Sequence, residues 1–525
     1  MTYIDNLLNK ITMYRLVLYY LLALFGAAII FGALGVMSLN PLSIVVSTLI
    51  VLAVCWLTNR ALAAILLAPV NVESAYITAL ILALIISPIK LAPFDWAGFG
   101  FLVSASIFAM ASKYMLAANR KHIFNPAAIA VVLTAFIFNQ YASWWVGGNI
   151  PLLAFVLIGG LLIVRKIQRF DLVIAFFVAA LASIILTNTG YSPLAITEQA
   201  LIHTSLFFFA FVMLTEPLTT PPTRPLRIAY GLLVGALFSP AIHIGSVYAT
   251  PELALVVGNL FSFAVSPKKK YVLKLSSKQK IADDIYNFVF SADGKANTSK
   301  FNFRPGQYME WTMPTGNGLT LLGGHDDRGN RRYFTIASSP TETEIHLGVK
   351  FYGEAAGEPG MSSSFKKKLL ALQPGDRILA GSLAGDFTLP RATKKSPGKF
   401  VFIAGGIGIT PFRSMIKYLS DASAADSGKT HDIVLLYSNR NASEIAYRET
   451  FDEAEKAIAL KTIYVNTNTD GRIDADFIER EIPDWRERMY YLSGPHTMVV
   501  AFENELQDLG VPRSKIKTDF FPGFA

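Results

Sequence analysis

The chain has 525 residues, of which 52% are hydrophobic and 16% are charged, and its mean hydropathy is +0.41. The formal net charge of +9 is spread over both halves of the chain, so it does not indicate a nucleic-acid-binding domain. Cys55 is the single cysteine, which excludes an intramolecular disulfide, a thiolate zinc site and a cysteine-ligated iron–sulfur cluster. We therefore expect no nucleic-acid partner and no metal site.

Charged residues divide unevenly at Pro267. Residues 1–267 contain 12 Lys/Arg and 7 Asp/Glu, which leaves 35 and 31 for the rest of the chain. Since a domain usually has roughly 100 to 200 residues, the length allows several domains. We predict a polytopic α-helical membrane domain followed by a soluble antiparallel β-barrel domain and a soluble α/β domain. The predicted ranges are 1–267, 268–395 and 396–525.

Apolar segments of spanning or near-spanning length recur in the membrane half and predict about ten transmembrane helices. The first segment follows a polar lead of about fifteen residues without an obvious small-residue cleavage site, so we expect a retained helix. The segments lie at about 16–37, 42–66, 75–93, 97–117, 125–140, 150–164, 170–187, 199–214, 228–243 and 251–266.

The positive charges predict the orientation of these helices. If the N-terminus lies inside, only Lys90 of the 15 Lys/Arg up to Lys270 falls on the outer side, as the positive-inside rule expects. We therefore expect a multi-pass protein of the cell membrane, with the lipid bilayer as a partner. Both termini and the soluble half are expected in the cytoplasm.

Two stretches of the membrane half are polar or irregular. They are NRKHIFNPAAIAVVL (119–133) and MLTEPLTTPPTRPLRIAYGLLVGAL (213–237). Irregular backbone at membrane depth survives only where it is buried in protein or lines a cavity. Each stretch is therefore either an ordinary proline-rich cytoplasmic turn or part of a ligand pocket. The candidate pocket residues are Asn125, Thr215, Glu216 and Thr219.

The FNPAA helix start, the MLTEPLTTPP…YGLLVGAL segment and the count of ten helices resemble the NqrB/RnfD membrane flavin subunits, over about residues 10–267. These subunits belong to the sodium-translocating NADH:quinone reductase and the Rnf electron-transport complex. The resemblance implies a second flavin, FMN or riboflavin, in the membrane domain. Members of the family link a flavin to Thr in an S-G-A-T type sequence, which this chain lacks, so we expect the flavin to be noncovalent.

The soluble half changes pattern at about Lys399. FNFRPGQYMEWTMP and RRYFTIASSPTETEIHLGVKF alternate polar and apolar residues between Gly/Pro breaks, as strands of an antiparallel barrel do. The apolar strand KFVFIAGG then leads into glycine turns and helical stretches, which predicts a nucleotide-binding α/β unit. In AGGIGITPFRSMIKYL, the glycines allow close approach of a pyrophosphate at the start of a helix.

RRYFTIASSP, AGGIGITPF, YLSGPHTMV and DFFPGFA occur in this order and resemble the ferredoxin–NADP reductase superfamily, over about residues 270–525. The resemblance implies an FAD-binding barrel and an NAD(P)-binding α/β domain. It gives Arg332 a contact with the FAD phosphates, places Tyr333 against the isoalloxazine and places Thr335 near the reactive N5 atom. The remaining FAD contacts that it implies are Gly360, Ser362 and Ser363 at the pyrophosphate, with Phe524 covering the flavin face.

The same resemblance implies residues for the nicotinamide nucleotide. Ser493 stands where many relatives have a cysteine beside the nicotinamide, and its hydroxyl can still form a hydrogen bond there. Arg440 either reads a 2′-phosphate, which would favour NADPH, or faces solvent. The other implied nucleotide contacts are Gly405, Gly406, Gly408, Thr410, Pro411, Gly494 and Pro495.

These patterns predict a membrane-bound flavin oxidoreductase. Hydride would pass from NADH or NADPH to FAD on the cytoplasmic side, and single electrons would enter or cross the membrane through the second flavin. The acceptor would be a quinone or an extracytoplasmic flavoprotein. Thr335, Ser493 and Phe524 are the expected catalytic residues.

Two other functions remain open at this stage. The membrane half could be an anchor or a transporter, with Glu216 marking a transport site. Alternatively, the chain could be a haem-type transmembrane ferric reductase, which needs pairs of axial histidines on facing helices. The membrane half offers only His122, which lies in a basic loop, and His203 and His243, which we expect on separate helices.

Overall fold

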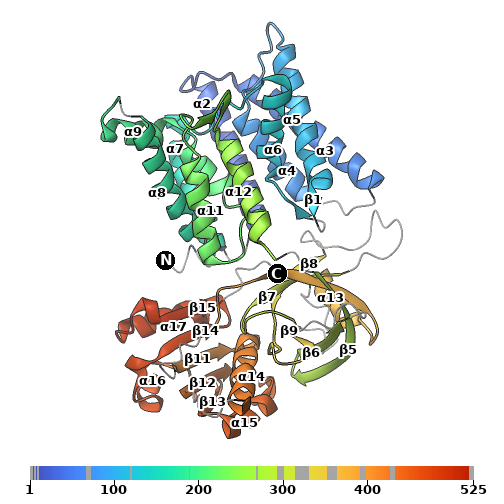
Figure 1. Ribbon diagram of the computed structural model, residues 1–525, viewed down its shortest axis with the longest axis vertical. Helices are drawn as coiled ribbons and strands as arrows, with labels where there is room; N and C mark the ends of the chain where they lie inside the picture. The colour runs from blue at the N-terminus through green and yellow to red at the C-terminus, as the bar shows by residue number, and fades with distance from the viewer. Residues whose placement is uncertain are drawn as a thin grey trace. The chain divides into compact units, whose positions relative to one another are not determined.

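The computed structural model describes residues 4, 7–8, 11–66, 72–118, 121–188, 190–267, 270–292, 301–313, 330–351, 363–390, 398–425 and 432–519. It divides into two compact units, Met1–Ser266 and Pro267–Ala525 (Figure 1).

The described part of the N-terminal unit is almost entirely helical. Five of its helices are long and apolar enough to cross a membrane, or six if the pair Pro193–His203 and Leu206–Met213, bent by 65°, forms one span. The elements are α2 (Met13–Ala33), α3 (Pro41–Ile65), α4 (Val72–Ile85), α5 (Trp96–Met115), α6 (Pro126–Phe138), α7 (Ile150–Ile167), α8 (Phe170–Thr187), α9 (Pro193–His203), α10 (Leu206–Phe208), the π-helical turn η1 (Phe209–Met213), α11 (Arg224–Ala236) and α12 (Pro251–Val265).

The apolar segments of the sequence thus correspond to helices, but ten complete crossings stay a prediction. Helices α4, α6, α11 and α12 have only 14, 13, 13 and 15 residues. A helix needs about 20 residues to span the hydrocarbon core of a bilayer.

Local chemistry explains where several of these helices begin. The Asn40 side chain accepts hydrogen bonds from the amides of Leu42 and Ser43 at the start of α3, and Asn125 does the same for Ala127 and Ala128 in α6. A proline follows each cap, at a position whose amide needs no partner within the helix.

In the described part of this unit, the helical segments form two groups with the same order of elements. Counting the bent pair as one segment, each group has five segments, and a short hairpin precedes the last one. The hairpins are β1 (Ala117–Ala118) with β2 (Lys121–His122), and β3 (His243–Ile244) with β4 (Val247–Tyr248). Helix α3 packs on α5 as α8 packs on α11, and the groups meet where α2 contacts α7 and α6 contacts α12. This arrangement is that of an internal repeat.

The C-terminal unit begins with an antiparallel sheet. Its described strands follow the order β8-β7-β10-β5-β6-β9, and the end strands β8 and β9 also contact each other, so the sheet curls into a barrel (Figure 1). Fully buried Trp311, Phe288 and Phe290 fill its interior. The elements are β5 (Lys270–Ala282), β6 (Ile285–Ala292), β7 (Tyr308–Thr312), β8 (Arg331–Thr335), β9 (Ile345–Lys350), the helix α13 (Ser364–Ala371) and β10 (Arg377–Ala384).

The second part of this unit is a parallel sheet with the described strand order β13-β12-β11-β14-β15 and helices on both faces. The chain order reverses beside β11, and in sheets of this kind ligands bind at that point, outside the carboxyl ends of the strands. The elements are β11 (Lys399–Gly405), the 3₁₀ turn η3 (Gly406–Ile409), α14 (Thr410–Ala425), β12 (Asp432–Asn439), α15 (Arg448–Ala457), β13 (Leu460–Asn466), α16 (Ala475–Glu481), β14 (Met489–Ser493), α17 (His496–Asp508) and β15 (Ile516–Asp519).

Candidate functional site

The glycine turn after β11 lies at the reversal point of the parallel sheet. Ala404 near the end of β11 is in register with Ser493 at the end of β14. A Cβ atom on Gly408 would meet the backbone carbonyl of Ser493 and would lie 2.6 Å from the Cα of Gly494. The turn and the Ser493–Gly494 segment are therefore in direct backbone contact.

Most of the nucleotide-binding residues predicted from the sequence meet at these strand ends. Gly406 adopts a φ of +53°, which favours glycine, and the half-exposed turn leads directly into α14, whose first residue is the buried Thr410. Backbone amides at the start of α14 can bind a pyrophosphate. Arg440 follows β12 and is exposed. The other predicted residues at this place are Gly405, Gly408, Pro411, Ser493, Gly494 and Pro495.

Strand β8 carries the residues predicted for the flavin. Arg332 is buried, its Nη1 donates to the carbonyl of Arg331 (2.7 Å), and its guanidinium lies 5.6 Å from the ring centre of Phe365. Phe365 stands in the first turn of α13, which Ser363 caps by accepting from the amide of Lys366. The structure thus brings Arg332 to the helix start that the sequence assigns to the FAD pyrophosphate.

The hydroxyl of Thr335 supports the fit of a flavin. Thr335 Oγ1 is buried and has no hydrogen-bond partner among the described residues. A buried hydroxyl without a partner is costly, and a ligand that accepts its hydrogen bond would remove that cost. Tyr333, in contrast, donates from its hydroxyl to Glu310 Oε2 (2.8 Å) and is only half-buried. Gly360, Ser362 and Phe524 lie outside the described residues.

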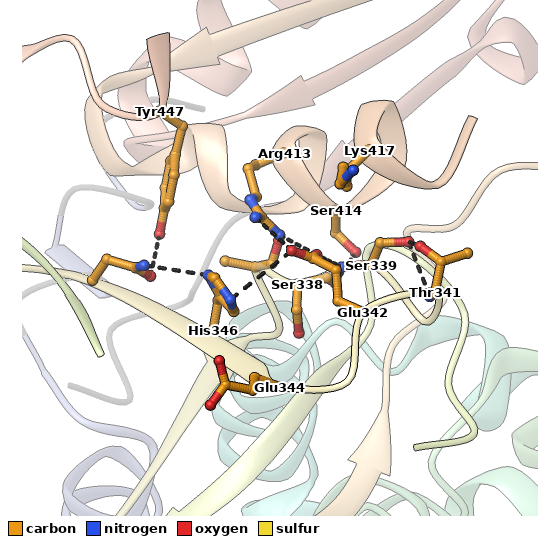
Figure 2. Close-up of polar contacts among 12 residues, drawn as sticks. Ser338, Ser339, Thr341, Glu342, Glu344, His346, Arg413, Ser414, Lys417 and Tyr447 are labelled. Carbon is orange, nitrogen blue, oxygen red and sulfur yellow. Dashed lines mark hydrogen bonds and ion pairs between the residues drawn. The ribbon is translucent and has the colours of Figure 1, made fainter. Parts of the chain in front are cut away.

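Helix α14 joins the two parts of this unit, as Figure 2 shows. Ser414 Oγ donates to the carbonyl of Ser338 (2.6 Å), and Arg413 Nη1 donates to the carbonyl of Ala337 (3.1 Å). Ala337 and Ser338 follow Thr335 directly in the chain. The helix that begins at the nucleotide turn is therefore fixed to the segment that leaves the flavin strand.

Two functional candidates in this region have no sequence motif that predicts them. One is the ion pair that Arg413 forms with Glu342, across 71 residues of sequence. The other is Asp519, the last residue of β15, which is in register with Ser493. Desolvation raises the pKa of the Asp519 carboxyl to about 7. Only the hydrophobic strand pattern of β15 could have placed this carboxyl beside the nucleotide site.

The membrane candidates are partly brought together. Glu216 accepts from or pairs with His122 Nε2 at 2.8 Å, and Thr219 Oγ1 donates to the other Glu216 oxygen at 3.2 Å. Thr215 is buried and donates to the carbonyl of Phe211 in its own helix. Glu216, His122 and Thr219 thus form a polar cluster, and Thr215 does not join it.

Asn125 lies three residues after His122 and is almost fully buried. Its side chain caps α6, and its amide donates to Asn259 Oδ1 (2.8 Å). Asn259 Nδ2 in turn donates to the hydroxyl of Tyr230 (3.0 Å). This chain of hydrogen bonds joins α6, α12 and α11 inside the unit.

One expectation about the membrane histidines is wrong. His243 does not lie on a helix but in the exposed hairpin strand β3, where its ring lies 5.0 Å from that of Tyr248. The Gly-containing turn between β3 and β4 ends the helical pattern before this residue. His203 is the last residue of α9, and His122 is paired with Glu216. The described histidines of the unit therefore do not offer the facing helical pairs that two haems need.

Comparison with known proteins identifies the C-terminal unit. Residues 402–504 match the oxidoreductase NAD-binding domain family. The chain is 27% identical over 244 residues to flavohemoprotein A of Dictyostelium discoideum, a match that covers 46% of this chain and 57% of the relative. It is 26% identical over 236 residues to oxidoreductase NAD-binding domain-containing protein 1 of Bos taurus, covering 41% of this chain and 70% of the relative.

Among solved structures, a ferredoxin–NADP+ reductase from Plasmodium falciparum aligns with 48% of this chain and 97% of its own, at 17% identity and a TM-score of 0.39. The chain spans little more than half the length of the first of the curated relatives. The family match and the site geometry show that the C-terminal unit is an oxidoreductase module of the ferredoxin–NADP reductase type, which binds FAD and NAD(P)H.

Proposed function

We propose that the protein is a membrane-bound flavin oxidoreductase that takes a hydride from NADH or NADPH onto FAD in its C-terminal unit. The observation that carries this proposal is the joining of the nucleotide turn to the flavin strand through Ser414 and Ser338. FAD suits the function because it accepts two electrons from a hydride donor and can release them one at a time.

The residues of the chain would position the reactants. The guanidinium of Arg332 and the start of α13 would bind the FAD phosphates, since both offer positive charge and N–H donors. Thr335 would donate to the flavin ring. The glycine turn would bind the pyrophosphate of the nucleotide, and Ser493 would hold the nicotinamide by a hydrogen bond.

The experiment that tests this function is anaerobic reduction of the detergent-purified full chain by NADH and by NADPH, followed at the flavin absorbance. Bleaching by either nucleotide supports the proposal. A protein that contains FAD and is bleached by neither would refute it. The ratio of the two rates also tests whether Arg440 favours NADPH.

We further propose that the electrons continue into the N-terminal unit, which would hold a second, noncovalent flavin of the FMN or riboflavin type. The polar cluster of Glu216, His122 and Thr219, with Asn125 nearby, supports a ligand site at the two broken stretches. The acceptor would be a quinone or an extracytoplasmic flavoprotein, and the C-terminal unit would face the cytoplasm. Two flavins per chain, measured by acid extraction, would support this path, and one flavin would contradict it.

The internal repeat of the N-terminal unit favours a second candidate. Repeats with broken helices are common in transporters, whose binding sites lie between the two halves. In that case the N-terminal unit would bind a transported solute near Glu216, and the purified chain would contain one flavin. Uptake into proteoliposomes that depends on Glu216 would support this alternative.

A further inference from the structure

Arg413 leaves the first turn of α14 and reaches across to the barrel. Its side chain is buried, and its guanidinium meets both carboxylate oxygens of Glu342, with Nη2 at 2.8 Å from Oε1 and Nη1 on Oε2 (Figure 2). Two parallel bonds of this kind fix the relative orientation of the two groups as well as their distance. Burial by itself would raise the pKa of Glu342, but the hydrogen bonds and charge of Arg413 lower it, so the carboxylate is charged at neutral pH.

Glu342 is itself held in place on the barrel side. Its Oε2 also accepts from the amide of Ser339 at 2.5 Å. In the same loop, Thr341 Oγ1 donates to Asp421 Oδ2 of α14 at 2.5 Å. Together with the Ser414–Ser338 bond, side chains along α14 bind the loop that follows the flavin strand at several points.

A second contact lies on the other side of Arg413. Its guanidinium is 5.7 Å from the ring centre of Tyr447, whose hydroxyl donates to Asn287 Oδ1 of the barrel at 3.1 Å. A Cβ atom on Gly348 in β9 would lie 2.5 Å from that hydroxyl and 2.9 Å from the Thr410 Cγ2 atom. The α/β part is thus seated closely on β9, and Arg413 lies between the two contact regions.

We propose that Arg413 and Glu342 are a positioning pair that sets the distance and angle between the nicotinamide and the flavin. This inference rests on the proposed hydride transfer. Arg413 is two residues after Pro411 of the nucleotide turn, and the carbonyl it binds belongs to Ala337, two residues after Thr335. Few bonds therefore separate this ion pair from either reactant.

The pair takes no part in the chemistry itself. A hydride, carrying two electrons and one proton, leaves C4 of the dihydronicotinamide and bonds to N5 of the flavin, and NAD(P)+ remains. Arg413 and Glu342 neither donate nor accept a proton or an electron in this step. Their effect would come through geometry, because a displacement of about 1 Å can slow a reaction roughly 100-fold.

The test uses Glu342→Gln, Arg413→Gln and Arg413→Lys in the detergent-purified full chain. Lys461→Gln is the matched control, since it removes an exposed ion pair with Glu481 (3.1 Å) by the same kind of charge change. The limiting rate of anaerobic flavin reduction is measured at saturating NADH and NADPH, with and without deuterium at the transferred position. Flavin content and the Kd for the oxidised nucleotide are measured in parallel.

A second measurement does not depend on turnover. Spin labels at Gln279→Cys in β5 and Glu479→Cys in α16, both exposed positions, report the distance between the two parts by pulsed dipolar spectroscopy. Cys55 is 1% exposed, and the unmodified chain serves as the labelling control. We expect a single narrow distance in the otherwise unchanged chain and a broadened one in Glu342→Gln and Arg413→Gln.

For the two Gln variants we expect limiting rates about 10 to 100-fold lower, with flavin content unchanged and nucleotide Kd within about 2-fold. The isotope effect should show that hydride transfer limits the slow variants. Arg413→Lys keeps the charge but not the paired geometry, so its rate should lie between.

Unchanged limiting rates with an unchanged distance distribution would overturn the inference. So would a loss of rate that only parallels a loss of bound flavin, because that result indicates a structural role. If no nucleotide reduces even the unmodified chain, the proposed hydride transfer fails. In that case the spin-label distances alone decide whether the pair sets the geometry.

Discussion

Ser414 Oγ lies 2.6 Å from the carbonyl oxygen of Ser338, although 76 residues separate the two in the chain. One residue belongs to the helix that starts the nucleotide site and the other to the loop that follows the flavin strand. Both residues are completely buried. A contact of this kind between the two parts supports several specific experiments.

Replacement of Gly348 by Ala should disturb the seat of the α/β part on β9. The added methyl group would lie 2.5 Å from the hydroxyl of Tyr447, a group held by its bond to Asn287. We expect overpacking of about 1 to 3 kcal/mol, seen as a lower thermal midpoint, and slower flavin reduction. Gly348→Ala with Tyr447→Phe removes the nearest atom and should recover part of both losses. No recovery in the double variant would contradict this explanation.

Arg332→Ala should release FAD from the purified chain. The guanidinium is buried beside the start of α13, so its loss removes the main positive charge expected at the FAD phosphates. Flavin content should fall at least 10-fold, while far-ultraviolet circular dichroism shows that the helical unit stays folded. Arg440→Ala, at an exposed position, is the control and should keep its FAD. Full flavin content in Arg332→Ala would refute this placement of the site.

Gly408→Ala should block nucleotide binding without loss of FAD. The methyl group would meet the carbonyl of Ser493 and the Cα of Gly494, and backbone atoms cannot turn aside as a flexible side chain can. We expect NAD(P)H to bind at least 10-fold more weakly in equilibrium titrations. Ser493→Ala leaves that carbonyl in place and should bind the nucleotide nearly normally. Equal affinity in Gly408→Ala and the unmodified chain would show that the turn is not the nucleotide site.

Stability of the C-terminal unit should fall between pH 6.5 and pH 4 because of His346. Burial, aided by the charge of Arg413, lowers the pKa of His346 from 6.5 to about 4. The unfolded chain therefore takes up a proton before the folded chain does, so stability present above about pH 6.5 is lost as the pH falls toward 4. The loss is about 3 kcal/mol.

His346→Gln cannot take up this proton but can still accept from Asn287 Nδ2, which lies 3.2 Å from His346 Nδ1. Thermal midpoints of both proteins, followed by release of flavin fluorescence, should therefore diverge above pH 4 and converge near it. A parallel decline of the two midpoints over this range would assign the loss to other groups.

Asp519→Asn should stabilise the unit above pH 7. Desolvation raises the pKa of Asp519 from 3.8 to about 7, so the carboxyl contributes fully to stability below about pH 4 and loses that contribution as the pH rises through 7. The amide variant should be more stable by about 1 to 3 kcal/mol at pH 8 and equal at pH 4. Asp508→Asn, at an exposed position of α17, is the matched control. A stabilisation that does not change with pH would contradict this assignment.

Much of the C-terminal unit could be read from residues close together in the chain. The alternation in RRYFT and the apolar run KFVFIA predicted β8 and β11, because a strand is defined by which face each side chain buries. The glycine turn after β11 needs backbone freedom at Gly406 and close contact at Gly408, and only glycine provides both. The two parts of the module and their nucleotide turn were therefore visible without a structure.

The N-terminal unit shows where such reading ends. Apolar runs predicted where helices lie, but α4 and α6 end after 14 and 13 residues. Hydropathy measures only the oiliness of a window, and a short helix buried among others is as apolar as one that spans the bilayer. The number of crossings depends on packing between helices, which no single segment encodes.

The tertiary structure alone placed the contacts between distant side chains. Arg413 is one of many arginines in the sequence, and Glu342 has no motif, yet the fold makes them a bidentate pair. Asp519 likewise looks like an ordinary polar residue at the end of a strand until register places it beside Ser493. Burial and neighbouring charge decide the chemistry of such groups, and both arise only when segments far apart in the chain are packed together.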